Sequence, residues 1–193
     1  MFAALVPPEE VAEGLADFLA PRRDAAPFRW TSPEQVHLTL AFYADVPEHD
    51  VEALAETIAD TSARRRALRL RVAGGGAFPD PDRGRVLVAG VEAEEDDRDE
   101  LSRLAGACRR AGPRVGTEVD GQRFRPHLTV ARCGRPTSLT SWVRLLDSYR
   151  GPPWAAGEVS LVASYLGEGP RRRPRYQVVA VAPLAPSPGA EGK

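Results

Sequence analysis

The sequence predicts an α+β fold of two pseudo-symmetric lobes, with antiparallel sheets lining a central groove and helices on the outside. Short segments in which apolar and polar residues alternate are interspersed with segments of helical periodicity, which is typical of this class. The tripeptide His-Leu-Thr occurs twice, at 37–39 and at 127–129, about half a chain apart. Each copy lies in an expected strand that is followed by a helix and two more strands, and this order indicates a weak internal duplication.

In the first half of the chain, turn residues separate the expected elements. Glu9 and Glu10 follow Pro8 and favour the start of a helix, and Pro47 starts a second one. The triplet Gly74–Gly76 lacks the Lys-Ser/Thr of a P-loop and indicates a turn between two strands. The expected elements are a strand at 2–6, a helix at 8–19, strands at 28–31 and 36–43, a helix from 47 through 58, and strands at 68–72 and 85–91.

In the second half, an acidic run at 92–100 leads into a helix, because negative charge is favourable near a helix N-terminus. The expected elements are a helix at 97–111, the second His-Leu-Thr strand, a helix at 138–149, and strands at 158–166 and 175–181. Residues after Leu184 are rich in Pro, Gly and Ser. We therefore expect residues 1–184 to form a single bilobal domain and residues 185–193 to form a flexible C-terminal tail.

Composition restricts the class of protein. The chain has 193 residues, of which 42% are hydrophobic and 27% charged, as in an ordinary soluble globule. Its formal net charge of −1 cannot collect polyanions over a wide surface, so local basic groups must hold any anionic ligand. Cys108 and Cys133 are spaced neither like a zinc site nor like a disulfide framework, which favours reduced thiols in the cytoplasm. The apolar start is too short for a signal peptide, and no segment approaches the roughly 18 apolar residues of a membrane span.

The doubled motif carries the chemistry. Alternation along a strand places His37 and Thr39 on one face and, in the second copy, His127 and Thr129 on one face. Two imidazoles in one cleft can hold one neutral and one protonated ring, because their unperturbed pKa is about 6.5. One ring can take a proton from an attacking oxygen while the other protonates a leaving oxygen, and the two hydroxyls can hold phosphate oxygens. This division of labour suits displacement at phosphorus and demands no metal.

Other residues near the motifs are weaker candidates for binding the substrate. Arg132 lies five residues after His127, on the opposite face under strict alternation, so its contact with phosphate requires a β-bulge or the end of the strand. Phe42 falls on the Leu face and is expected in the core. Trp30 and Phe78 are better candidates for stacking on a nucleobase, although burial is the more ordinary fate of such rings.

Two arginine runs, at 64–66 and at 171–173 with Arg175, could meet an RNA backbone. The more ordinary interpretation of each is a solvated surface run balanced by the acidic stretch at 92–100. His49 lies between two acidic residues and is expected to be solvated.

The phrases HLTLAF and HLTVAR, half a chain apart, resemble the two His-x-Thr motifs of the 2H phosphoesterase superfamily. More narrowly, the chain is similar to the RNA 2′,3′-cyclic phosphodiesterase family, also called 2′-5′ RNA ligases. The likeness includes FAALVPP, RWTSPEQVHLTLAFYADV, GRVLVAGV, FRPHLTVARC, LVASYLGEG and RYQVVAVAPL. Where the family usually has Leu-Gly after the Phe of the first motif, this chain has Tyr43-Ala44.

The resemblance implies metal-independent hydrolysis of an RNA or nucleotide 2′,3′-cyclic phosphate to a 2′-phosphomonoester. In that scheme His127 is the general base on water and His37 is the general acid on the 3′ oxygen, while Thr39, Thr129 and Arg132 bind the phosphate. The expected partners are RNA ends or nucleotides that bear a 2′,3′-cyclic phosphate. We expect no cofactor, no metal and no membrane association, and a monomeric, cytoplasmic protein.

Two alternatives stay open. The same site could join RNA ends through a 2′-5′ bond, or hydrolyse another cyclic phosphate. A protein of another class, an RNA-end-binding module without turnover, would not need two titrating rings, so the intact His and Thr of both copies count against it.

Overall fold

The computed structural model describes residues 1–119, 121, 123–165, 167–169 and 174–187. Its strands are β1 (Phe2–Leu5), β2 (Arg29–Trp30), β3 (Leu38–Phe42), β4 (Leu68–Phe78), β5 (Gly84–Glu92), β6 (His127–Thr137), β7 (Arg150–Ala156), β8 (Glu158–Tyr165) and β9 (Arg175–Pro183). Its α-helices are α1 (Glu9–Leu19), α2 (Val51–Ala63), α3 (Glu95–Arg114) and α4 (Thr140–Asp147), and its 3-10 turns are η1 (Ala20–Ala25), η2 (Pro33–Gln35) and η3 (Glu48–Asp50). The predicted α+β class is confirmed.

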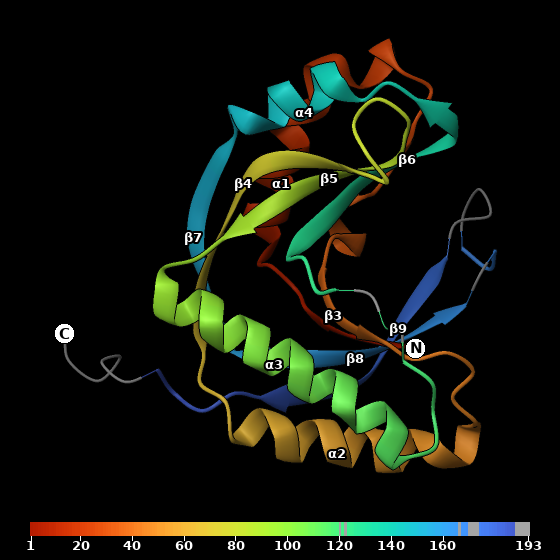
Figure 1. Ribbon diagram of the computed structural model, residues 1–193, viewed down its shortest axis with the longest axis vertical. Helices are drawn as coiled ribbons and strands as arrows, with labels where there is room; N and C mark the ends of the chain where they lie inside the picture. Colours follow the sequence, from red (N-terminus) through yellow and green to blue (C-terminus); the bar gives the residue numbers. More distant parts are fainter. Residues whose placement is uncertain (120, 122, 166, 170–173, 188–193) are drawn as a thin grey trace.

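The strands form one antiparallel sheet with two halves. The order is β7-β4-β5-β6-β3-β1-β8-β9, and β2 pairs with β6 beside this path. The halves β7-β4-β5-β6 and β3-β1-β8-β9 meet where Leu38 of β3 pairs with Leu128 of β6, a place we call the seam. Each His-Leu-Thr copy therefore lies on the strand that borders the seam, and the two predicted lobes correspond to the two halves (Figure 1).

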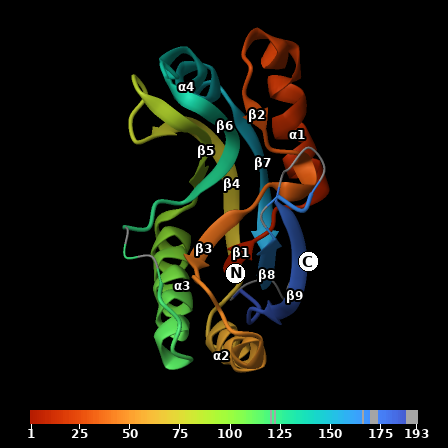
Figure 2. The ribbon, with the colours of Figure 1, turned by 90° about the vertical axis from the view of Figure 1, so that its right-hand side faces the viewer.

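Helices cover the outside of the strands, as Figures 1 and 2 show. In the upper half, α4 packs on β4 and β5, and α1 packs on β7. In the lower half, α2 packs on β8, β9 and α3, while α3 also reaches β3 and β4. One continuous core runs through both halves and contains Leu15 of α1, Ile58 of α2, Leu104 of α3 and Leu146 of α4. None of the helices in the described part of the chain combines the length and the apolar character needed to cross a bilayer.

Two sequence predictions are wrong in the upper half. The expected elements included no strand at Arg150–Ala156, where Pro152 and Pro153 lack the N–H that a ladder requires. Strand β7 tolerates them because it lies at the edge of the sheet. Gly74–Gly76 is not a turn between strands but an interior part of β4, where the register with β5 shifts between Val72 and Gly75. A Cβ on Gly75 would lie 2.5 Å from the Val143 carbonyl oxygen, so glycine lets α4 pack closely.

The predicted flexible tail, residues 185–193, begins with a residue that is held by the body of the protein. Ala185 forms a parallel bridge with Arg66, and its amide donates a hydrogen bond to the Arg65 carbonyl over 2.7 Å. The chain thus stays attached to the body through Ala185, and residues 188–193 of the predicted tail lie outside the described residues.

Candidate active site

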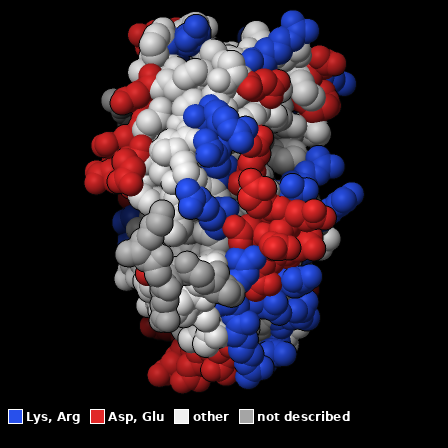
Figure 3. Space-filling model, turned by 90° about the vertical axis from the view of Figure 1, so that its left-hand side faces the viewer, with Lys and Arg blue, Asp and Glu red and all other residues white. Residues whose placement is uncertain are grey.

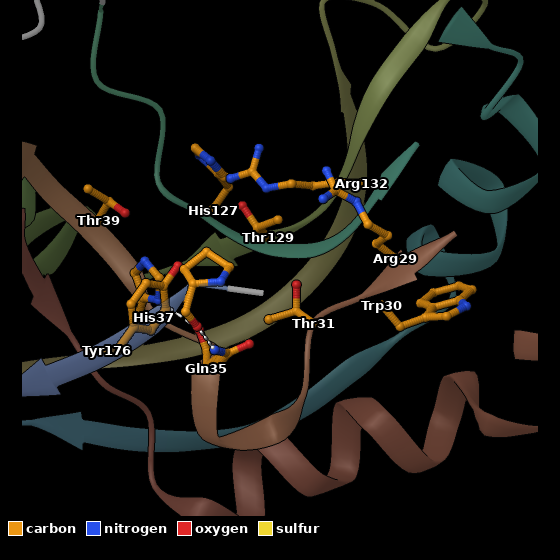
Figure 4. A pocket seen from close by; sticks show the side chains of 11 residues that line it. Arg29, Trp30, Thr31, Gln35, His37, Thr39, His127, Thr129, Arg132 and Tyr176 are labelled. Atoms are coloured by element: carbon orange, nitrogen blue, oxygen red, sulfur yellow. Dashed lines mark hydrogen bonds between the residues drawn. The ribbon is translucent and has the colours of Figure 1, made fainter. Parts of the chain in front are cut away.

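A pocket of about 200 Å³ lies at the seam, and we call it the seam pocket. Both His-Leu-Thr copies contribute their His and Thr to it, as the sequence predicted, and Arg132 lines it too (Figure 4). The lining residues are Arg29, Trp30, Thr31, Gln35, His37, Thr39, His127, Thr129, Arg132, Pro174 and Tyr176. The two motifs thus converge on one cavity because their strands are neighbours in the sheet.

Both imidazoles are oriented by the same local hydrogen bond. Nδ1 of His37 lies 2.7 Å from the Gln35 carbonyl oxygen, and Nδ1 of His127 lies 2.6 Å from the Arg125 carbonyl oxygen. Because a carbonyl oxygen can only accept, each Nδ1 carries the hydrogen in these contacts. Each Nε2 is then left to accept a proton when the ring is neutral and to donate one when the ring is protonated. This is the atom that acid-base chemistry requires.

Aromatic rings fix the position of each imidazole. Phe2 of β1 stacks on His37 with ring centroids 4.5 Å apart, and Tyr176 of β9 meets the same ring edge-on at 5.5 Å. Phe78 at the end of β4 meets His127 edge-on at 5.0 Å. Phe78 therefore supports the second histidine, whereas the sequence suggested it as a platform for a nucleobase. Such ring pairs contribute about 0.5–1.5 kcal/mol each beyond burial.

Matched β-bulges follow the two motifs. In β3, Thr39 pairs with Ala4 and Ala41 with Ala3, so Leu40 is an extra residue. In β6, Thr129 pairs with Val88 and Ala131 with Leu87, so Val130 is the extra residue. In each strand the bulged residue lies three positions after the histidine. A bulge reverses the alternation beyond it, so the fifth residue after each histidine shares the face of that histidine.

These bulges determine which face of the sheet the Arg132 and Phe42 side chains lie on. Arg132 reaches the seam pocket, which satisfies the condition that the sequence set for its contact with phosphate. Phe42 was expected in the core, and that prediction is wrong: its side chain is 49% exposed. The two residues hold equivalent places, one basic and one aromatic, in the two halves of the sheet.

The electrostatics of the pocket lower the pKa of both histidines. For His37, burial is the main cause, and the positive charges of Arg132 and His127 act in the same direction against the hydrogen bond to Gln35. For His127, burial is again the main cause and Arg132 adds to it, against the hydrogen bond to Arg125. Both rings are thus poised to be neutral in the free protein, and an incoming anion would favour their protonation.

The sequence assigned no role to one wall of the pocket, apart from Trp30 as a stacking candidate. Arg29 and Trp30 enter it from β2, which pairs with β6 just beyond the bulge. Thr31 follows β2, and its amide donates to the Val130 carbonyl over 2.8 Å. Gln35 donates from Nε2 to the Pro174 carbonyl over 2.8 Å, so it ties the start of β9 to the first motif. A strand of two residues has no periodicity to detect, and these side chains come together only in the folded sheet.

The aromatic and basic candidates outside the motifs are explained by packing and pairing. Trp30 borders the pocket but also packs on Phe28 and Trp142, at centroid distances of 5.6 and 5.2 Å. Arg65 and Arg66 form ion pairs with Glu100 and Asp97 of α3, as the balanced-surface interpretation predicted. In Figure 3 basic and acidic side chains lie next to one another on the face shown.

The remaining basic candidates also have structural explanations. Arg175 pairs with Glu168 and lies 4.1 Å above the ring of Tyr165. The run at 171–173 lies outside the described residues. The side chain of His49 is 82% exposed, as predicted.

The unusual Tyr43-Ala44 pair is accommodated by α3. The Tyr43 ring is fully buried, and its hydroxyl donates to the Cys108 carbonyl over 2.8 Å. Tyr43 forms an isolated antiparallel β-bridge with Val119, and the Ala44 amide donates a hydrogen bond to the Glu118 carbonyl over 3.2 Å. Tyr43 thus joins the strand of the first motif to α3.

Known proteins place the chain in a family. The family model described as LigT-like phosphoesterase matches residues 5–88 and 91–171. An RNA 2′,3′-cyclic phosphodiesterase of Aeropyrum pernix is 31% identical over 81% of this chain and 88% of that protein, and one of Thermus thermophilus is 31% identical over 86% and 82%. An RNA 2′,3′-cyclic phosphodiesterase of Geobacillus stearothermophilus is 29% identical over 97% of this chain, but the match spans only 58% of that protein's length.

Solved structures agree with this placement. A crystal structure of a Thermus thermophilus protein has a TM-score of 0.75 at 28% identity, covering 95% of this chain and 96% of that one. The crystal structure of E. coli LigT complexed with 3′-AMP has the same TM-score and coverage at 24% identity, a likeness of fold. The chain therefore belongs to the LigT-like phosphoesterase family, within the 2H phosphoesterases.

Proposed function

We propose that this protein hydrolyses 2′,3′-cyclic phosphates of RNA ends or nucleotides to 2′-phosphomonoesters, without a metal, by a two-histidine acid-base mechanism. One observation carries the proposal: two imidazoles, each with Nδ1 engaged and Nε2 left for proton transfer, line one pocket with two threonines and Arg132. Relatives at about 30% identity carry the name of this activity, which supports the same substrate class here.

In the proposed reaction, a water oxygen attacks phosphorus while Nε2 of His127 takes the water proton. The bond from phosphorus to the 3′ oxygen breaks, and Nε2–H of His37 protonates that oxygen. Thr39 and Thr129 donate hydrogen bonds to the non-bridging oxygens, and Arg132 neutralises the growing charge. The product carries a 2′-phosphate and a free 3′-hydroxyl. The rings exchange protonation states, so proton transfer through solvent resets the site.

The test uses an oligonucleotide that ends in a 2′,3′-cyclic phosphate. We expect the wild-type protein to form the 2′-phosphomonoester in the presence of a chelator. His37→Ala and His127→Ala should each lower kcat by at least about 100-fold, the lower end of what acid-base catalysis contributes, with an unchanged circular dichroism spectrum. Full activity of both variants would refute the proposal, and a joined product formed with a 5′-hydroxyl partner would favour ligation.

The assignment of acid and base has its own test. A substrate with sulfur in place of the 3′ oxygen has a leaving group that needs little protonation. His37→Ala should then lose far less activity on the sulfur substrate than on the oxygen substrate, whereas His127→Ala should lose the same activity on both. The reverse pattern would exchange the two roles.

We also propose that the protein acts as a monomer in the cytoplasm. His37, His127, Thr39, Thr129 and Arg132 all come from one copy of the chain, so the proposed reaction steps require no residue of a second copy. Cys108 and Cys133 are unpaired and buried, which suits a reducing compartment. Light scattering after size exclusion should give the mass of one chain, and a dimer that loses activity on dilution would contradict this.

A further inference from the structure

Two arginines face each other at one side of the seam pocket. Arg29 of β2 pairs directly with Arg132 of β6, and both side chains are exposed and line the pocket. Directly opposed residues on antiparallel strands have Cβ atoms about 4.5–5.5 Å apart, and like charges in that arrangement are destabilising. Figure 4 shows the two side chains lying together along the same rim. The fold therefore maintains an unfavourable pair of cations at its pocket.

Neither guanidinium of this pair is neutralised within the described part of the chain. Arg29 and Arg132 form no ion pair and no side-chain hydrogen bond there, whereas Arg66 and Arg150 each pair with a carboxylate. The chain contains 27 Asp and Glu residues, so carboxylates are abundant. Two unneutralised cations at a pocket are the arrangement that an anionic ligand would stabilise.

The two arginines lie at different distances from the catalytic imidazoles. Arg132 is close enough to both histidines for its charge to add to burial in lowering their pKa, and its charge also acts against the burial that raises the pKa of Tyr176. Figure 4 shows the Arg132 side chain extending toward His127, whereas the Arg29 side chain lies beyond it along the rim. One guanidinium is thus placed for the reacting phosphate, and the other for an anion beyond it.

We propose that Arg29 binds a second phosphoryl group, the one on the 5′ oxygen of the nucleoside whose cyclic phosphate reacts. This inference rests on the proposed function. A nucleoside 2′,3′-cyclic phosphate carries its next possible phosphate at the 5′ position, on the other side of the ribose. The second group is a diester in an RNA end and a monoester in a nucleotide. The protein then prefers substrates that carry it over a bare nucleoside 2′,3′-cyclic phosphate.

The experiment compares three substrates: adenosine 2′,3′-cyclic phosphate, the same compound with a 5′-phosphate, and the dinucleotide ApA ending in a 2′,3′-cyclic phosphate. We expect kcat/KM of the wild-type protein to be higher for the two substrates with a 5′-phosphoryl group. Arg29→Gln should lower kcat/KM on those two by about tenfold, the effect of losing one hydrogen bond to a charged group. The preference over the bare compound should shrink accordingly.

Arg64→Gln is the matched control, because Arg64 is exposed at the end of α2 and does not line the seam pocket. It should leave the preference intact. A preference for the dinucleotide over the 5′-phosphate compound identifies RNA ends as the source of the second phosphate, and the opposite preference identifies nucleotides. An equal preference in Arg29→Gln and wild type would overturn the inference. Failure to hydrolyse any of the three substrates would instead overturn the proposed function.

A second measurement needs no variant. Salt screens the attraction between exposed charges, so a second contact between a phosphate and an arginine adds to the salt dependence of binding. The wild-type kcat/KM should therefore fall more steeply with salt for the dinucleotide than for the bare compound. Equal slopes would contradict a second phosphate contact.

Discussion

Replacing Leu38 with alanine should destabilise the whole chain in one cooperative transition. Leu38 is fully buried and pairs with Leu128 at the seam where the two halves of the sheet meet. Leu→Ala removes three carbon atoms, each contributing about 0.8 kcal/mol of transfer free energy, and the cavity left behind adds to this. We therefore expect a loss of about 3–4 kcal/mol in the free energy of unfolding.

The assay is urea denaturation followed by two probes. All three tryptophans belong to the upper half, since Trp30 lies on β2, Trp142 on α4 and Trp154 on β7. Far-UV circular dichroism reports mainly on the lower half, because α2 and α3 have 13 and 20 residues and α1 and α4 only 11 and 8. One domain predicts coincident transitions that shift together in Leu38→Ala.

The control is Val178→Ala, whose side chain is 55% exposed on β9 and should change stability by less than about 0.5 kcal/mol. Separate fluorescence and dichroism transitions would refute a single domain. A loss below about 1 kcal/mol in Leu38→Ala would refute the burial of the seam.

Arg132→Gln should move the bell-shaped profile of kcat/KM to higher pH. Burial lowers the pKa of both His37 and His127, and the Arg132 charge lowers it further, so removing that charge should raise the pKa that governs each side of the profile. A shift to lower pH would contradict this electrostatic account. Phe42→Ala should change the free energy of unfolding, measured by urea denaturation, by less than about 1 kcal/mol, because the ring is half exposed. A loss above about 3 kcal/mol would show that the ring is buried in a core. Gly112→Ala should lower the melting temperature, because the new Cβ would lie 2.3 Å from Cγ2 of Val119. A higher melting temperature, which helix propensity alone predicts, would show that Val119 can move aside.

The sequence predicted the site residues that alternation alone can place. His37, Thr39, His127 and Thr129 lie before the bulges, so period-2 reasoning was sufficient for them. Phe42 lies after a bulge, and the same reasoning put it on the wrong face. Two consecutive apolar residues, Leu-Ala in one motif and Val-Ala in the other, were the signal that alternation breaks.

Other features depend on tertiary pairing and could not be read locally. The position of Arg29 at the pocket follows only from its pairing with Arg132, about 100 residues later in the chain. The aromatic support of His37 comes from Phe2 and Tyr176, which lie near opposite ends of the chain. The edge position of β7, which tolerates Pro152 and Pro153, likewise follows from the order of the whole sheet.

A crystal structure with orthovanadate bound tests the central claim most directly, because five-coordinate vanadium imitates phosphorus under attack. The account predicts vanadium in the seam pocket, with Nε2 of His37 and Nε2 of His127 toward opposite apical oxygens and the hydroxyls of Thr39 and Thr129 on equatorial oxygens. Vanadate held by one His-Thr pair alone, or bound away from both, would contradict the account.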